Sequence, residues 1–277
     1  MTQVQLQAGL GEESKEIPRN RNRPRRRKRA RQVGGVVLAL ALWEVLSSTG
    51  AINKDALPTP AATVAAMASH LGALSSALAS TLEAWALGML AAGVGGIVVG
   101  TLVGRSKTAD AATETIVRMM RPLPSLALIP IAILIAGLGI KMTSGLVSFA
   151  AFWPVFINTR VGVRQVDNLA LETAKVLGLK RFSLLYRVVL PSASPIIASG
   201  LQVAISLALV VTVSVELVGG TGGLGQFILS AQQGNETATM FAGIIVGGII
   251  GWALSTGFAR LVDRLIPWRT RGAGGTR

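Results

Sequence analysis

The segment ETAKVLGLKRFSLLYRVVLP, residues 172–191, separates two long apolar stretches of the chain. The residues on either side are mostly Ala, Val, Leu, Ile and Gly, whereas this segment carries four basic residues, one acidic residue and one glycine. Long apolar stretches are typical of membrane-spanning segments, and a charged segment between them belongs in water. The segment therefore indicates a water-exposed element between two spans.

The composition as a whole is that of a membrane protein. Hydrophobic residues make up 51% of the 277 residues, charged residues only 14%, and the mean hydropathy is +0.56. Such values lie outside the range of soluble domains. The chain has no cysteine and a single histidine, His70, which excludes thiolate chemistry and makes a histidine-based metal site implausible. His70 is therefore interpreted as a polar residue at a helix end or in a loop.

Six apolar runs, most of them about as long as a bilayer is thick, predict six transmembrane helices. They are residues 33–52, 77–104, 123–140, 144–163, 193–218 and 241–262. None shows the alternation of a barrel strand, so we predict an all-α integral membrane protein. Its expected parts are a disordered basic tail (1–32), a first helix (33–52) that is an uncleaved anchor rather than a signal peptide, a five-helix core (77–262) and a C-terminal tail (263–277).

The distribution of basic residues predicts the orientation. Nine Lys and Arg residues lie between Arg19 and Arg31, directly before the first apolar run. If that end is cytoplasmic, every Lys and Arg except Lys54 and Lys141 falls on the cytoplasmic side, as the positive-inside rule requires. We therefore expect a multi-pass protein of a bacterial inner membrane with both termini, and the loop at 168–191, in the cytoplasm. A nucleic-acid-binding arm is the alternative interpretation of the basic block.

The loop itself predicts two short helices that meet at a glycine corner. Asp167 and Asn168 are good helix-starting residues, Gly178 suits a left-handed helix cap, and a second helix is expected from Arg181 until Pro191 ends it. This physical pattern fits either a helix lying on lipid or a docking surface for another protein.

The spacing of certain loop residues resembles the Glu-Ala-Ala motif of ATP-binding-cassette (ABC) importer permeases. The matching residues are Glu172, Thr173, Ala174, Gly178, Val188, Leu190 and Pro191, where Thr173 replaces an Ala and Val188 an Ile. The stretches LPTP (57–60), RPLPSLALIPIAIL (121–134), FWPVFINTRVGV (152–163) and VELVGGTGGLG (215–225) are similar to the subgroup that imports aliphatic sulfonates, taurine or nitrate.

The resemblance implies a type I importer permease fold and a set of partner proteins. Those partners are a second permease subunit forming a homodimer, two cytoplasmic ATPase subunits and an extracytoplasmic binding protein. The ATPase-coupling residues would be Glu172, Thr173, Ala174, Gly178, Leu190 and Pro191, with Ala174 and Gly178 small enough to let the loop enter a groove of the ATPase. The chain has no phosphate-binding loop of its own, so it is not expected to be an enzyme or to hold a cofactor, and ATP and Mg²⁺ would bind the partner ATPase.

Polar residues and prolines within the apolar runs are candidates for the cargo pathway. They are Pro130, Pro154, Asn158, Gln202 and Glu216. A simple kink is the alternative role for each proline, and an exposed carboxylate would repel an anionic cargo. Small residues at four-residue spacing, Gly96–Gly100–Gly104 and Gly243–Gly247–Gly251, predict close helix packing.

Two other functional classes compete with the importer permease. An ion-gradient-driven secondary transporter would be expected to show paired inverted repeats with broken helices, and no convincing repeat is present. A membrane-anchored nucleic-acid-binding protein would need the arginine-rich tail for its function.

Overall fold

The computed structural model describes residues 23–49, 56–120 and 123–270, and all the regular structure in these ranges is helical. The chain divides into two compact units, Met1–Asn53 and Lys54–Arg277. The first unit contains one helix, α1 (Arg23–Ser48). This helix begins within the tail that the sequence predicts to be disordered, because Arg and Lys have high helix propensity and extend the apolar helix toward the N-terminus. Residues 1–22 of the predicted tail, and most of the predicted C-terminal tail, lie outside the described residues.

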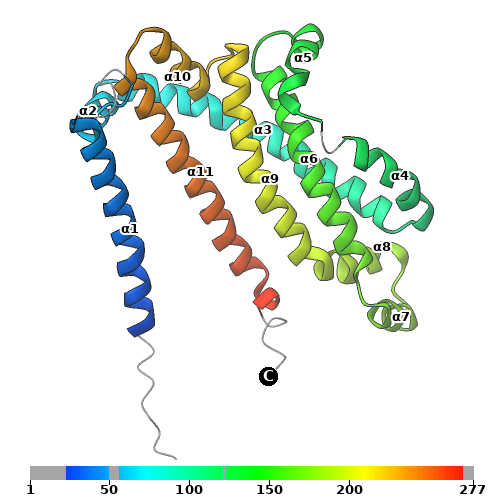
Figure 1. Cartoon of the computed structure of the whole chain (residues 1–277). Coiled ribbons are helices and arrows are strands. Elements are labelled where there is room, and N and C mark those ends of the chain that lie inside the picture. Colours follow the sequence, from blue (N-terminus) through cyan, green and yellow to red (C-terminus); the bar gives the residue numbers. More distant parts are fainter. Residues whose placement is uncertain (1–22, 50–55, 121–122, 271–277) are drawn as a thin grey trace, which may run out of the picture. The chain divides into compact units, whose positions relative to one another are not determined.

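The second unit is a bundle of long helices joined by short ones (Figure 1). In chain order the elements are α2 (Pro60–Ser69), α3 (Leu71–Gly104), α4 (Lys107–Met120), η1 (Ser125–Leu128), α5 (Ile129–Ala136), α6 (Ile140–Arg164), α7 (Asn168–Val176), α8 (Arg181–Leu184), the π-helical turn η2 (Leu185–Val189), α9 (Leu190–Gly219), α10 (Gly223–Gln233), α11 (Thr237–Leu265) and η3 (Pro267–Thr270). The short helices α2 and α10 have no counterpart in the sequence-based prediction.

Four segments within the described residues are long and apolar enough to cross a membrane. They are α3, α6, α11 and the continuous segment that α8, η2 and α9 form together. A fifth span is obtained if α4 and η1–α5, which meet at 84°, are counted as one. The predicted single helix at 123–140 is wrong: Pro130 lies in the first turn of α5, Gly137 ends α5 with a φ of +70°, and Gly139, with a φ of +130°, precedes α6. The described apolar part of α1, Gly34–Ser48, is shorter than a span, so the number six stays a prediction.

Glycines let α3 pack directly on the backbone of α6. A Cβ on Gly96 would lie 2.8 Å from the Cβ of Val155, and a Cβ on Gly100 would lie 2.8 Å from the carbonyl oxygen of Phe156. Only glycine therefore permits this distance between the two helices. Gly104 approaches the carbonyl of Arg160 in the same way. The predicted close packing of this glycine series is confirmed, and it lies within the chain.

The pair α6 and α9 is joined by a second close crossing. A Cβ on Gly200 of α9 would lie 2.6 Å from the Cβ of Asn158 and 2.8 Å from the carbonyl oxygen of Pro154. Pro154 lies inside α6 without ending it, so α6 runs past the proline to Arg164. Helices α3, α6 and α9 therefore form one closely packed unit, and α7 and α8 lie at the end where α6 leads toward α9 (Figure 1).

The glycine series of α11 behaves differently from that of α3. Gly243 packs against Phe227 and Ile228 of α10, and Gly251 against Leu209 of α9, whereas a side chain at Gly247 would meet nothing within 4 Å. The prediction of close packing thus holds at both ends of this series and not in its middle.

Candidate functional site

The loop between α6 and α9 has the helix–corner–helix form that its sequence predicts. Asp167 caps α7 by accepting a hydrogen bond from the backbone N–H of Leu169 at 2.9 Å. Beyond α7, the N–H of Leu179 donates to the carbonyl of Ala174 at 3.1 Å and that of Gly178 donates to Lys175 at 2.9 Å. This pair of bonds is the Schellman arrangement, and it requires the left-handed conformation that Gly178 adopts, with φ of +77°.

The second half of the loop differs from the prediction at Pro191. The helix does not end there: α8 passes through η2 into α9, and Pro191 lies in the first turn of α9. The π-helical turn η2 absorbs the change of direction before this proline. Because α8, η2 and α9 are continuous, a displacement of α8 reaches α9 without a flexible joint.

Large apolar side chains cover the outside of the loop. We call Val176, Leu177, Phe182 and Tyr186 the outer face; Val176 is 87% exposed and Phe182 81%. Large apolar side chains that are exposed together on one short loop make that loop a candidate interaction surface. The sequence analysis did not single out Val176, Leu177 or Tyr186, although Val176 and Leu177 directly precede the glycine corner.

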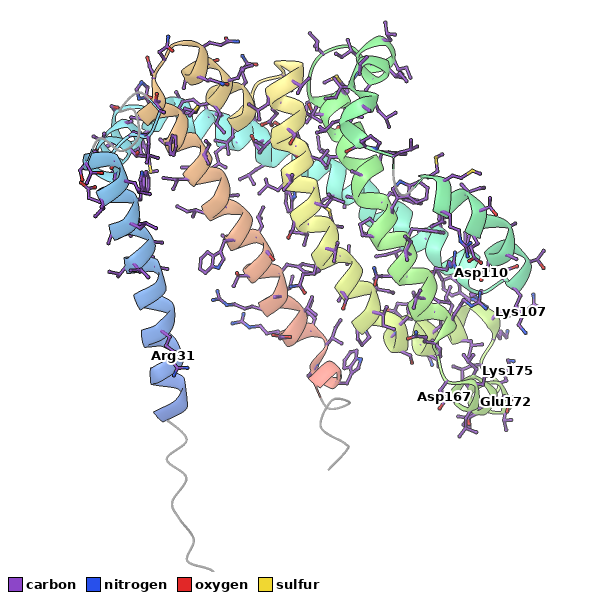
Figure 2. The ribbon with its side chains drawn as sticks, viewed as in Figure 1. Arg31, Lys107, Asp110, Asp167, Glu172 and Lys175 are labelled. Carbon is purple, nitrogen blue, oxygen red and sulfur yellow. The ribbon has the colours of Figure 1, made fainter. Side chains whose placement is uncertain are left out.

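The motif residues occupy two different positions around this outer face. Glu172, Thr173 and Gly178 are exposed, and Figure 2 shows Glu172 on α7 together with Lys175 and the capping Asp167. Ala174 is only 6% exposed, so its small side chain serves packing inside the loop rather than close approach from outside. On the bundle side, Leu190 packs against a buried cluster that contains Val163 and Val166, whereas Val188 is half-buried and Pro191 is exposed.

A buried ion pair ties α4 to the end of α6 that leads into the loop. Asp110 of α4, 7% exposed, pairs with Arg160 through Oδ1 and Nε at 2.7 Å and also with Arg164 one turn further along α6. Figure 2 shows Asp110 on α4 near this end of the bundle. The arginines point to one face because they are four residues apart. The sequence analysis missed this contact; its signal was the single aspartate in a connection that carries four basic residues and one other acid, Glu114.

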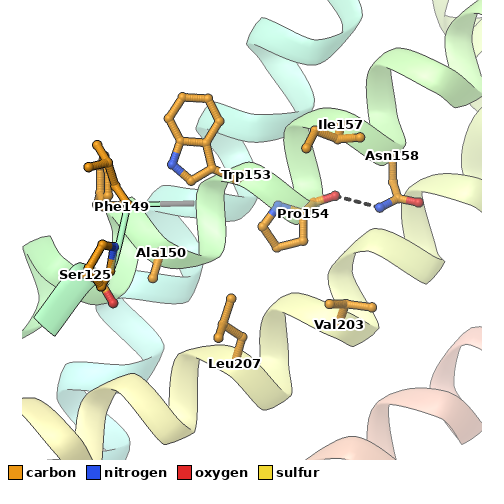
Figure 3. Close-up of a pocket in the computed structure, with 11 residues that line it drawn as sticks. Ser125, Phe149, Ala150, Trp153, Pro154, Ile157, Asn158, Val203 and Leu207 are labelled. Atoms are coloured by element: carbon orange, nitrogen blue, oxygen red, sulfur yellow. Dashed lines mark hydrogen bonds between the residues drawn. The ribbon is translucent and has the colours of Figure 1, made fainter. Parts of the chain in front are cut away.

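A cavity of about 510 Å³ lies between the segment before α5, helix α6 and helix α9 (Figure 3). We call it the α6–α9 cavity. Of the predicted pathway residues, Pro154 and Asn158 line it, and the Nδ2 of Asn158 donates to the carbonyl of Pro154 at 2.8 Å. Pro130 is exposed in the first turn of α5 and Gln202 is half-buried on α9, and neither lines the cavity.

Glu216, the remaining pathway candidate, is held in a hydrogen-bond network at the end of α9 remote from the loop. Its carboxylate accepts hydrogen bonds from Oγ1 of Thr81 at 2.9 Å and from the N–H of Gly225 at 3.0 Å, and the N–H of Leu224 donates to the same threonine oxygen at 2.8 Å. Glu216 is 2% exposed. The network fastens the first turn of α10 to both α3 and α9, which gives Glu216 a structural role that is sufficient to explain its burial.

Comparison with known proteins assigns the chain to a protein family. Residues 92–271 match the family described as binding-protein-dependent transport system inner membrane component, which covers more than half of the chain. The chain belongs to this family. It is therefore the permease subunit of an ABC importer, and the match supports that function over the ion-gradient-driven alternative.

Relatives of known name cover most of this permease. A Bacillus subtilis (strain 168) protein named as an aliphatic sulfonates transport permease, SsuC, is 34% identical over 90% of this chain and 92% of its own. The Escherichia coli (strain K12) taurine transport system permease protein TauC is 31% identical over 85% and 88%. The nitrate import permease protein NrtB of Synechococcus elongatus is 28% identical over 83% and 84%.

Solved structures share the fold of the permease. A chain of the MetNI methionine ABC transporter, in an inward-facing conformation, aligns with a TM-score of 0.56 at 19% identity over 67% of this chain and 94% of that one. A chain of an amino acid ABC transporter aligns with a TM-score of 0.55 at 18% identity over 73% and 96%. The predicted all-helical importer permease fold is thereby confirmed. Within the described ranges, no three His, Asp or Glu side chains are placed so that they could hold a metal ion.

Proposed function

We propose that this permease carries a small anion across the membrane and that the loop at 168–191 is the docking element for its ATPase. The outer face carries this proposal, because a permease without a phosphate-binding loop needs a contact surface for the subunit that hydrolyses ATP. Four large exposed apolar side chains around a rigid glycine corner form a compact anchor of the kind that protein partners bury. The proposed coupling residues are Glu172, Thr173, Ala174, Gly178, Leu190 and Pro191.

The proposed transmission of force follows from the helix contacts. The α8–η2–α9 segment is continuous, α9 and α6 cross at Gly200, and α6 is packed on α3 through the glycine series. A push on the loop by a closing ATPase dimer would therefore move these three helices as one body. The partners we propose are a second copy of the permease, two ATPase subunits and an extracytoplasmic binding protein, with both termini of the permease in the cytoplasm.

The proposed cargo follows from the relatives. Their names specify aliphatic sulfonates, taurine and nitrate, all of which carry a compact oxyanion group. We propose a cargo of this class for the present permease.

Reconstitution tests this function directly. The permease is purified with its ATPase and binding protein, placed in proteoliposomes, and supplied with labelled 1-butanesulfonate, taurine or nitrate. We expect uptake of at least one of these anions that requires ATP and the binding protein and persists when ionophores collapse the ion gradients. Uptake that follows a sodium or proton gradient without ATP, or no uptake of any of the three, would refute the proposal.

A further inference from the structure

The α6–α9 cavity has one unusual polar feature, the indole N–H of Trp153. This nitrogen is shielded from water and has no hydrogen-bond partner among the described residues. In Figure 3 it lies on the edge of the ring nearest Phe149. A buried donor without a partner is costly, and most native proteins avoid one. By contrast, the indole N–H of Trp85 donates to the carbonyl of Ile205 at 3.2 Å, as a buried tryptophan normally does.

Other hydrogen-bonding groups face the same cavity. Asn158 uses one of its two amide N–H donors for the carbonyl of Pro154 and keeps the second. Ser125, at the start of η1, adds a hydroxyl. Pro154 has no N–H, so the carbonyl of Ala150, which also lines the cavity, lacks its usual helical donor. Three neutral donors from two separate elements, and one acceptor in the carbonyl of Ala150, therefore border one space.

Among the residues that the structure describes, the remaining wall of the cavity is apolar and uncharged. Phe149 and Ile157 of α6 and Val203 and Leu207 of α9 supply it, and none of the eleven lining residues carries a charge. A ligand with a cationic group would find no carboxylate here to replace its hydration. A bare inorganic oxyanion would leave the apolar wall without a contact. A compact anion with an aliphatic chain matches both parts of the lining.

We propose that the α6–α9 cavity is a transit site for an aliphatic sulfonate, with Ser125, Trp153 and Asn158 donating hydrogen bonds to the sulfonate oxygens. This inference rests on the proposed function and assigns selectivity to the permease as well as to the binding protein. The indole N–H of Trp153 gives up no hydrogen bond to a described residue when it turns toward the anion, although its ring must shift against Phe149, Phe152 and Phe156, which it contacts edge to face. Because the donors are neutral, the anion binds weakly enough to leave again, which a transport pathway requires.

Fluorine NMR tests the site without relying on transport. The permease–ATPase complex is labelled with 5-fluorotryptophan and studied in nanodiscs without the binding protein. The Trp153→Phe variant assigns the resonance of Trp153, and Trp252→Phe assigns that of Trp252, which is 68% exposed on α11 and serves as the matched control. We expect 1-butanesulfonate, added to tens of millimolar, to shift the Trp153 resonance in a saturable way and to leave that of Trp252 unchanged. Taurine and sodium nitrate at equal concentration should shift it less.

Uptake measurements then separate this inference from the proposed function. In proteoliposomes, Trp153→Phe and Ser125→Ala should each raise the half-saturating concentration of receptor-delivered 1-butanesulfonate severalfold, up to about tenfold, because each removes one hydrogen bond to an anion. Trp252→Phe should not change it. ATP-driven uptake with no response of the Trp153 resonance, or an equal response to all three salts, would overturn the transit site and leave the importer function standing. Loss of all ATP-driven uptake in the unmodified complex would instead refute the proposed function.

Discussion

The corner at Gly178 offers the sharpest test of how the loop acts. Its φ of +77° lies in the left-handed region, yet a side chain added there would meet nothing within 4 Å. Substitution therefore strains the backbone and causes no collision inside the permease. For ordinary L-residues that strain is about 1–2 kcal/mol, it is larger for a β-branched residue, and it is smaller for asparagine. A penalty of that size lowers the equilibrium constant of the native corner roughly 5- to 30-fold.

A series of substitutions distinguishes backbone conformation from lack of space as the reason for this glycine. If conformation decides, activity should fall in the order glycine, asparagine, alanine, valine. If the glycine is needed for close approach of the ATPase, alanine should be better tolerated than the larger asparagine. The two Schellman hydrogen bonds at this corner fix the direction of α8 relative to α7, so we expect the conformational order.

The measurement is the number of cargo molecules imported per ATP hydrolysed by the reconstituted complex. Gly178→Val should reduce this ratio about tenfold or more, while the permease stays folded and loses at most the strain energy of the corner, because the corner is exposed and remote from the buried clusters. Gly178→Asn should remain within about threefold of the unmodified complex. Normal coupling in Gly178→Val would show that the corner geometry is irrelevant to ATPase docking.

Three further changes test other parts of the structure. Asp110→Asn leaves two arginines without their shared carboxylate and should lower the unfolding free energy by about 2 kcal/mol, allowing for partial solvent screening. The control Glu114→Gln, on the exposed side of α4, should leave the unfolding free energy unchanged. Equal thermal unfolding midpoints for the two variants would contradict this prediction. Gly225→Ala forces a methyl group onto the carbonyl oxygen of Val213 in α9 and should lower the unfolding free energy by about 3 kcal/mol in the same assay. Gly247→Ala places its methyl group in open space and should not lower the unfolding free energy. Phe182→Ser should leave stability unchanged and weaken ATPase binding in a pull-down titration about tenfold; unchanged binding would exclude Phe182 from the interface.

Local chemistry made several features readable from the sequence. The apolar runs, the cap at Asp167 and the left-handed Gly178 each depend on a few neighbouring residues, so their patterns predict the observed structure. The close approach of α3 to another helix was equally visible, because glycines at four-residue spacing form one flat stripe. The error at 123–140 arose because hydropathy counts apolar residues and takes no account of Pro130 and of the glycines that end α5.

The sequence by itself determined that this is an all-helical membrane protein with a charged loop of defined shape, because hydropathy and turn chemistry act between residues that are close along the chain. The resemblance of that loop to a motif of importer permeases pointed to the family. Only the tertiary structure showed which residues of different helices are in contact. Asp110 reaches Arg160 and Arg164, Glu216 reaches Thr81, and Trp153 faces a cavity shared with another helix. Such contacts depend on helix crossings set by packing, and no local pattern encodes the partner of a buried polar group.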